Sequence, residues 1–471
     1  MVTRPPPGRR PPGRGDDRRS GFGPPVSRAP EPPPRRAPKV DATVLFEMVA
    51  TCDAGMEKVL EAELQALGAQ VIALPPRAIV FRGDRDLLWR ANLWLRTANR
   101  VLLTIQRGKA ETRAALYDVA SSIPWEDILT ANESIAVDSR VSENPAFRRA
   151  EFVSQVVKDA ICDRLRQETG RRPDVNRRFP DVPVSVHVHG PRITILLDSS
   201  GERLGRRGYR AVAGTAPLRE TIAAGLLLNA GYDGSTPFLD PFCGSGTIAI
   251  EAALIARNVA PGLLRLRRQG PKPMTYGGDG AAILEPVGFA FERWLDHDAA
   301  AFAKVVASAR MEARDAQHPI VGSDSDGSVL RIAGENAQLA YVDESVTWSR
   351  GDALEVGPDA SGTLVVTNPP YGERLGEKTA VLALYKRYGD QMKQRYAGSV
   401  VWVLVGDPSD AGAFGLKPSR KLAFMNGDIE CRALRFELYE GTRRKREGAD
   451  LLKVDVPADL LAPVVPEDEP S

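Results

Sequence analysis

Residues 238–247 read FLDPFCGSGT, and this stretch decides the fold. Its apolar opening predicts a short buried strand, and the run TIAIEAALIA that begins at Thr247 predicts a helix. Between the two, Gly244 and Gly246 predict a tight turn in which the backbone can come close to a ligand. The first amides of the helix would face polar groups of that ligand. The stretch therefore predicts a strand, a glycine turn and a helix that together form one end of a binding site.

The acid before the glycines suggests which ligand this turn would take. The third glycine of a GxGxxG pattern is absent, because position 249 is Ala249. Asp240 stands at the carboxyl end of the predicted strand, where it could accept hydrogen bonds from a cationic or amino-bearing ligand. An Asp followed by Gly-x-Gly fits a nucleoside without a pyrophosphate better than NAD. A plain tight turn is the alternative.

Downstream of this unit, strand and helix patterns alternate. The strand patterns are PIVGSD, VTWSRGD, TLVVTNPP and SVVWVLVGD, and SVLRIAGENAQLA is typical of the helices between them. Strands that are apolar along their length and separated by helices indicate a parallel sheet covered on both faces. KLAFMNG and IECRALRFELYE predict a hairpin at the sheet edge. We therefore predict a doubly wound, Rossmann-like α/β domain over residues 206–440.

Acidic residues end the next two strands as well. Asp324 ends the second strand, where a doubly wound domain places the partner of a ribose hydroxyl, and Asp326 competes for that role. Asp352 follows the third strand and could accept from an adenine amino group. Each acid alone is more often a helix cap or a loop residue. Three acids at the ends of successive strands favour a nucleoside site.

The fourth strand ends in the tetrad Asn368, Pro369, Pro370 and Tyr371. An exocyclic base amine is a poor nucleophile, because its lone pair is delocalised into the ring. Methylating it requires acceptors that hold its two N–H bonds, and the Asn368 side chain and the Pro369 carbonyl can supply them. The prolines fix the turn, and Tyr371 offers a face on which a flipped base could stack. A proline-rich turn without chemistry is the alternative.

The chain before this domain has a different organisation. Residues 1–40 hold ten Lys and Arg against three acids, with twelve prolines, and we expect a disordered tail. Residues 44–205 mix amphipathic helices with alternating strands such as VPVSVHV and RITILLD, which indicates an α+β region. Residues 441–471 turn charged and proline-containing again, and a second flexible tail is expected there.

Composition excludes several classes of protein. With 471 residues, 63 Lys and Arg against 61 Asp and Glu, and 43% hydrophobic residues, the chain is typical of a globular protein with two or three domains. We expect no transmembrane segment, no signal peptide and therefore a cytoplasmic protein. The four cysteines lack CxxC spacing and the four histidines do not cluster with them, so neither a metal site nor a disulfide framework is expected.

Together these motifs resemble one known family. Asp240–Thr247 is similar to motif I, and Asn368–Tyr371 to motif IV, of the class I S-adenosylmethionine-dependent methyltransferases. With Arg207–Arg210, Ala216–Thr221 and GSDSDGSVLRIAGENAQLA, they resemble the THUMP-domain RNA methyltransferases. Within that family the likeness is to the N-terminal, guanine-methylating half of ribosomal RNA large subunit methyltransferase L. The longer enzyme carries a second methyltransferase domain, so only the first activity is inferred.

The resemblance implies a ferredoxin-like segment and a THUMP RNA-binding domain before the methyltransferase domain. It also implies S-adenosyl-L-methionine as cofactor and methylation of a guanine N2 amine in 23S ribosomal RNA or a ribosome-assembly intermediate. Transfer RNA is an alternative substrate, and a noncatalytic RNA-binding assembly factor is an alternative function. A fragment starting near Gly208 is expected to bind the cofactor but lose activity on RNA.

Carried over by position, the resemblance assigns the site. Asp240, Gly244 and Gly246 would line the methionine part of the cofactor, Asp324 its ribose and Asp352 its adenine. Arg219 and Glu220, before a helix that covers the methionine end, are weaker candidates. The full set of cofactor candidates is Asp240, Phe242, Gly244, Ser245, Gly246, Thr247, Asp324, Asp352 and Asn368, and the catalytic candidates are Asn368, Pro369, Pro370 and Tyr371.

Basic residues suggest where RNA would bind. Those around the THUMP region are Arg140, Arg148, Arg149, Arg171, Arg172, Arg177 and Arg178. A long insertion, residues 257–319, adds Arg265, Arg267, Arg268 and Lys272. Phosphate contacts are one interpretation of both sets. Solvated charge, or a plain surface loop in the case of the insertion, is the other.

Overall fold

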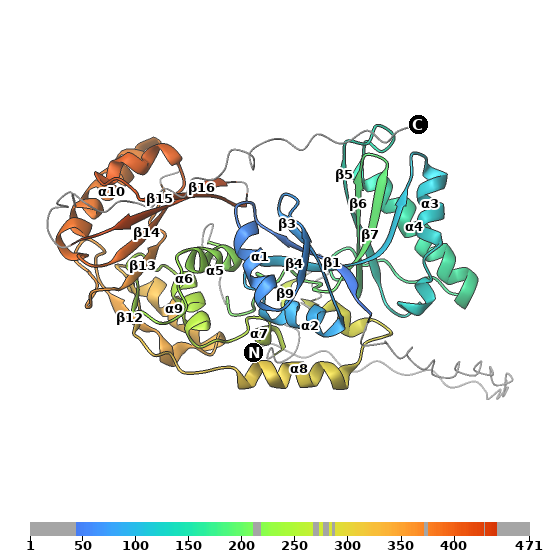
Figure 1. Ribbon diagram of the computed structural model, residues 1–471, viewed down its shortest axis with the longest axis horizontal. Helices are drawn as coiled ribbons and strands as arrows, with labels where there is room; N and C mark the ends of the chain where they lie inside the picture. Colours follow the sequence, from blue (N-terminus) through green and yellow to red (C-terminus); the bar gives the residue numbers. More distant parts are fainter. Residues whose placement is uncertain are drawn as a thin grey trace, which may run out of the picture. The chain divides into compact units, whose positions relative to one another are not determined.

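The computed structural model of this chain describes most of the regions between the two predicted tails (Figure 1). The described residues are 44–210, 218–266, 273–276, 282–284, 288–371, 375–427 and 429–439. The predicted tails, residues 1–40 and 441–471, lie outside them. Every helix within the described ranges is too short or too polar to cross a membrane.

The N-terminal region is built on one seven-stranded sheet with the order β2-β3-β1-β4-β7-β6-β5. The long strand β4 pairs with β1 on one side and β7 on the other, so it joins two halves of the region into a single sheet. All of its pairings are antiparallel except that of β5 with β6. Its elements are β1 (Phe46–Cys52), α1 (Glu57–Ala66), β2 (Gln70–Ala73), β3 (Ala78–Gly83), α2 (Arg85–Trp94), β4 (Ala98–Lys109), α3 (Arg113–Ser121), β5 (Ile135–Ser142), α4 (Ala150–Thr169), β6 (Val182–His189) and β7 (Arg192–Asp198).

The helices of this region lie over one face of its sheet. Local signals set their ends: Asp84 accepts from the Leu87 amide to cap α2, and α4 ends at Gly170, whose φ is 76°. Helices α3 and α4 pack together beside β5 (Figure 1). The opposite face carries a small apolar cluster of Val49, Leu102 and Leu196. Much of that second face is therefore polar.

The C-terminal domain has the doubly wound architecture that the sequence predicts. Its sheet has the order β12-β11-β8-β13-β14-β16-β15; the first five strands are parallel and the last two form an antiparallel edge hairpin. The elements are α5 (Glu220–Asn229), β8 (Phe238–Asp240), α6 (Thr247–Ala256), β11 (Ile320–Asp324), α9 (Gly327–Leu339), β12 (Thr347–Arg350), β13 (Leu364–Thr367), α10 (Leu375–Arg395), β14 (Val400–Val405), β15 (Arg420–Asn426) and β16 (Ile429–Glu437). The predicted fold class, α/β preceded by α+β, is confirmed.

The insertion between α6 and β11 is not a plain surface loop. It contains α7 (Leu263–Leu266), β9 (Pro273–Tyr276), β10 (Ala282–Leu284), a 3-10 turn (Ala290–Arg293) and α8 (Ala299–Met311). Phe289 and Phe291 are buried and stack on each other, and Phe291 also lies against Trp89 of α2. The insertion therefore packs its aromatic residues onto the N-terminal region, because a long loop with this apolar content gains stability by burial.

Arg265 of this insertion has partners within the protein. Its side chain is buried, donates to the carbonyls of Ser200 and Gly288, and lies over the ring of Phe289. A guanidinium with these partners is a structural group. Arg267, Arg268 and Lys272 lie outside the described residues.

Candidate active site

The glycine turn after β8 holds two glycines with different roles. Both lie in the left-handed region, with φ of 53° at Gly244 and 85° at Gly246. A Cβ at Gly244 would meet no atom within 4 Å, whereas a Cβ at Gly246 would lie 2.5 Å from Cη2 of Trp348 and 3.0 Å from the Cβ of Ala333. Gly244 therefore faces open space, and Gly246 lets the turn pack against α9 and β12.

This difference gives matched variants. We expect Gly244→Asn to fold normally, since Asn tolerates the left-handed region, and to weaken S-adenosylmethionine binding at least about tenfold by filling the open space. Valine at position 246 would strain the backbone and clash with Trp348, so we expect it to destabilise the domain by about 1–3 kcal/mol. Valine at position 246 would therefore not test the ligand site alone. Calorimetric titration and thermal melts separate the two effects.

Asp240 is buried and joins the glycine turn to the neighbouring strand. Its carboxylate accepts from the Thr367 hydroxyl at 2.6 Å and from the Phe242 amide at 3.3 Å. The Phe242 amide also donates to the Thr367 hydroxyl at 3.2 Å. The Asp240 carboxylate, the Phe242 amide and the Thr367 hydroxyl are therefore all hydrogen-bonded to one another. Burial raises the pKa of Asp240 to about 7, although the Thr367 hydrogen bond opposes the shift.

The other two acids lie at the ends of β11 and β12, the next two strands on one side of β8. Asp324 accepts from the Gly244 amide at 3.0 Å, which fixes the glycine turn against the end of β11. Asp326 instead accepts from the amide and hydroxyl of Ser328 and caps α9. Asp352 is exposed, accepts from the Leu354 amide and follows the end of β12. Because β8, β11 and β12 are adjacent and parallel, the three acids Asp240, Asp324 and Asp352 lie at the same end of the sheet, where the strands have their carboxyl ends.

The remaining residues of the turn have partners within the domain. The ring of Phe242 meets Tyr388 edge-on, with centroids 5.2 Å apart. The Ser245 carbonyl accepts from Asn336 of α9 at 3.0 Å. Thr247 begins α6, and its hydroxyl accepts from Arg210 at 3.4 Å. These contacts fix the turn from three sides.

The tetrad that follows β13 is held by hydroxyl groups. The Tyr371 hydroxyl donates to the side-chain oxygen of Asn368. Tyr385, a buried residue of α10, donates to the Pro370 carbonyl at 3.1 Å. Pro369 is buried and Pro370 exposed. Burial raises the pKa of the Tyr371 phenol, so this hydroxyl stays a donor at neutral pH.

Arg219 and Glu220 form ion pairs within the protein. Arg219 pairs with buried Asp53 of the N-terminal region at 2.9 Å. Glu220 pairs with Arg210 at 3.1 Å, and burial raises the pKa of this carboxyl. Thr215 to Pro217 of the same motif lie outside the described residues. Both side chains thus have a partner among the described residues, which indicates that they support the site from within the protein.

Two residues that contact this site, Thr367 and Tyr385, could not be identified from the sequence. Thr367 precedes the tetrad and Tyr385 comes seventeen residues after Asn368, on the next helix. A threonine at the end of an apolar strand, and a tyrosine on a helix, are common in any α/β domain. Only the pairing of β13 with β8, and the packing of α10, show that they touch the site.

Family comparisons agree with this architecture over the three parts of the chain. Residues 47–102 match the RlmL ferredoxin-like domain, residues 110–198 the THUMP domain, and residues 207–435 the RMKL-like methyltransferase domain UPF0020. Among solved structures, SMU.472, a methyltransferase candidate in complex with SAH, has a TM-score of 0.72 and 27% identity, over 84% of this chain and 99% of that one.

Relatives that match most of this chain are named as RNA methyltransferases. A ribosomal RNA large subunit methyltransferase K/L of Syntrophotalea carbinolica is 37% identical over 85% of this chain, which spans only 54% of that protein. A candidate RNA methyltransferase of Synechocystis sp., slr0064, is 34% identical over 83% of this chain and 96% of its own length. The chain thus spans about half the length of the K/L relatives and nearly all of the shorter one. It belongs to the THUMP-domain, RlmL-type methyltransferase family.

Proposed function

We propose that this protein transfers a methyl group from S-adenosyl-L-methionine to the N2 amine of a guanine in 23S ribosomal RNA. The observation that carries the proposal is the hydrogen bond between Asp240 and Thr367. It joins the end of β8, where the glycine turn begins, to the end of β13, where the tetrad begins. A cofactor on the turn and a base on the tetrad would therefore be neighbours.

The residues at the strand ends fit this cofactor. The open space before Gly244 leaves room for the methionine part, and the buried Asp240 carboxyl suits a cationic group. We assign Asp324 rather than Asp326 to the ribose, because Asp324 contacts the glycine turn through the Gly244 amide, whereas Asp326 caps α9. We assign Asp352, which follows β12, to the adenine amine. When bound, the cofactor supplies a methyl group on a sulfonium, which is electrophilic without any metal.

The tetrad supplies the acceptors that the amine needs. The Asn368 side-chain oxygen has two lone pairs, of which the Tyr371 hydroxyl uses one. The second lone pair and the Pro369 carbonyl can hold the two N–H bonds of the target amine as its nitrogen becomes tetrahedral. The Tyr385 contact fixes the Pro370 peptide and with it the direction of this turn. Catalysis comes from positioning and from acceptors placed in advance.

One experiment tests this proposal against two other functions, a transfer RNA methyltransferase and a noncatalytic assembly factor. Methylated guanines in ribosomal and transfer RNA, mapped by mass spectrometry in cells with and without this gene, should differ at one guanine of 23S RNA. A missing methyl group in transfer RNA instead would favour the transfer RNA alternative. Unchanged RNA from both sources would favour a noncatalytic assembly factor. The proposal places the enzyme in the cytoplasm, acting on ribosomal RNA or on an assembly intermediate.

The pKa of Asp240 predicts how cofactor affinity depends on pH. A carboxylate attracts the cationic cofactor and a neutral carboxyl does not, so affinity should fall as pH drops through about 7. We expect S-adenosylmethionine to bind about tenfold more weakly at a pH of about 6 than at about 8. Asp240→Asn should bind weakly with a flatter profile, which controls for titration of the cofactor itself. Equal slopes in both proteins would contradict the role of Asp240.

A further inference from the structure

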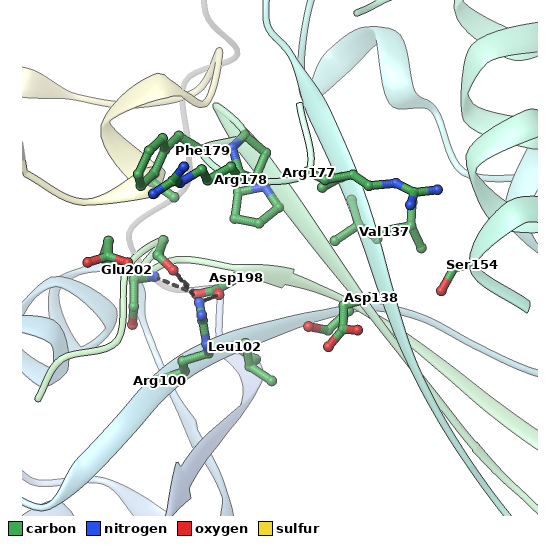
Figure 2. Close-up of a pocket in the computed structure, with 18 of the residues that line it drawn as sticks. Arg100, Leu102, Val137, Asp138, Ser154, Arg177, Arg178, Phe179, Asp198 and Glu202 are labelled. Carbon is green, nitrogen blue, oxygen red and sulfur yellow. Dashed lines mark hydrogen bonds and ion pairs between the residues drawn. The ribbon is translucent and has the colours of Figure 1, made fainter. Parts of the chain in front are cut away.

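The polar face of the N-terminal sheet carries a cavity of about 530 Å³, away from the glycine turn and the tetrad. Strands β4, β5, β6 and β7 form its floor (Figure 2). Residues 177–180 lie on its other side, and residues 288–293 of the insertion close one end. In Figure 2, Arg178 and Phe179 lie across the cavity from Arg100, Asp198 and Asp138. Helix α4 adds Glu151, Ser154, Gln155 and Lys158 to the lining. The strands, α4, residues 177–180 and residues 288–293 together therefore build one cavity.

The register of the strands explains the polar floor. Asp138 of β5 pairs with Ser185 of β6, and Arg140 of β5 pairs with His187 of β6. Because side chains alternate along a strand, these four point to the same face of the sheet. Strand β7 adds Asp198 to the lining. A stripe of hydrogen-bonding groups therefore crosses the three strands.

The positive charges of the cavity divide into paired and unpaired groups. Arg100 forms an ion pair with Asp198, and Arg293 forms one with Asp181 at 3.0 Å. Arg140 and Arg177 also line the cavity, are exposed, and form no ion pair with any described residue. These two guanidinium groups remain available for an anionic ligand, since nothing described in the protein neutralises them.

The strands of the floor and the segment 177–180 also suit a planar, hydrogen-bonding ligand. Burial, and then the nearby charge of Arg140, lower the pKa of His187, so its ring is neutral near pH 7 and can both donate and accept. Asp138 is exposed and offers acceptors only. Phe179 is partly buried, and the Arg178 guanidinium lies over its ring, 5.5 Å from the ring centroid. A nucleobase combines these requirements: it has donors on its edge and faces that stack.

We propose that this cavity binds one unpaired nucleotide of the RNA substrate, distinct from the guanine that is methylated. Arg140 and Arg177 contact its phosphate, Phe179 stacks on its base, and Asp138 accepts from the base edge. The volume is in the range of single small-ligand sites and too small for a duplex. The inference rests on the proposed function, because it makes the cavity a second contact point that holds RNA while the target base is in the active site.

A matched pair of double variants tests the site in the full chain. Arg140→Ser with Arg177→Ser removes both free cations of the cavity. Arg113→Ser with Arg192→Ser removes the same charge from exposed positions of the same region that do not line the cavity. A third variant, Phe179→Leu, removes the stacking ring. The probes are a short unpaired ribo-oligonucleotide and a blunt duplex of the same sequence, and fluorescence anisotropy measures their affinities.

We expect the cavity double variant and Phe179→Leu each to bind the unpaired probe about tenfold more weakly, with less than about threefold change in the control pair. Binding of the duplex should change equally in both double variants. Equal losses on the unpaired probe, or a loss on the duplex that matches it, would overturn the proposal. S-adenosylmethionine binding, measured alongside, should be unchanged in all variants and reports whether each is folded.

The experiments distinguish a failure of the proposed function from a failure of the nucleotide site. If the chain methylates no guanine and the cavity variants still lose the unpaired probe, the nucleotide site is supported and the reaction is wrong. If methylation proceeds and the cavity variants behave like the control pair, the reaction is supported and the nucleotide site is wrong.

Discussion

Asn368→Ala is expected to lower the rate of RNA methylation by about 10²–10³-fold, with S-adenosylmethionine affinity nearly unchanged. The loss has this size because the alanine side chain ends at Cβ and carries no oxygen, so one N–H bond of the target amine would lose its acceptor as charge develops on nitrogen. Single-turnover kinetics on the RNA substrate, with saturating cofactor, measure the step directly.

Tyr371→Phe provides the matched control for this variant. It removes the hydroxyl that orients the Asn368 side chain but keeps the aromatic ring and the acceptor itself. We therefore expect a smaller loss, about threefold to tenfold, because a single supporting hydrogen bond contributes about 0.5–1.5 kcal/mol. Wild-type turnover by Asn368→Ala would refute the base-amine mechanism. A loss of cofactor affinity as large as the loss of rate would place Asn368 in the cofactor site instead.

Sequence patterns predict the parts of this site that depend on neighbours along the chain. The glycine turn, the acids at strand ends and the Asn368 tetrad each combine a local backbone requirement with a characteristic residue. Parallel strands then bring their carboxyl ends to one edge, so a correct strand assignment also predicts that these residues meet. The placement of Asp240, Asp324 and Asp352 on one edge follows from that rule.

Contacts between distant residues decide what the sequence leaves open. In the sequence Asp326 competes with Asp324 for the ribose, and the structure separates them, because Asp324 contacts the Gly244 amide while Asp326 caps α9 through Ser328. The need for glycine at position 246 comes from Trp348, about a hundred residues later, which no local pattern predicts. Arginine is common at nucleic-acid contacts, and Arg265 stands in a basic stretch, but the fold buries its side chain over Phe289. Such packing depends on tertiary structure and has no period or motif.

The junction between the two regions bears on the expected behaviour of a fragment that starts near Gly208. Arg207, which precedes the catalytic domain, is buried and lies 3.4 Å from the buried carboxylate of Glu251 on α6. Arg207 also donates to the carbonyl of Arg96, and Arg96 donates to the Leu254 carbonyl of α6. A fragment starting near Gly208 would lack Arg207 and would expose the surface of α6 that Arg96 covers. We therefore expect this fragment to be unstable, and its loss of activity would say little about RNA recognition.

A single substitution measures the junction within the full chain. Glu251→Ala leaves Arg207 and Arg96 buried without their shared counter-charge, and it removes the acceptor of the Tyr209 hydroxyl at 3.1 Å. Breaking a buried ion pair from one side costs about 3–5 kcal/mol of unfolding free energy, because an uncompensated charge stays in a low-dielectric interior. Glu335→Ala on α9, which breaks an exposed pair with Arg331, should cost less than about 1 kcal/mol.

Urea denaturation, followed by tryptophan fluorescence and by limited proteolysis, would compare these two variants with the parent chain. A third variant, Glu251→Gln, keeps the volume and a hydrogen-bond acceptor for Tyr209 but removes the charge, so its loss should fall between the other two. If the charge were unimportant, Glu251→Gln would match the parent. If Glu251→Ala were no less stable than Glu335→Ala, the Glu251 charge would not stabilise the junction, and the electrostatic reason to expect an unstable fragment would be refuted.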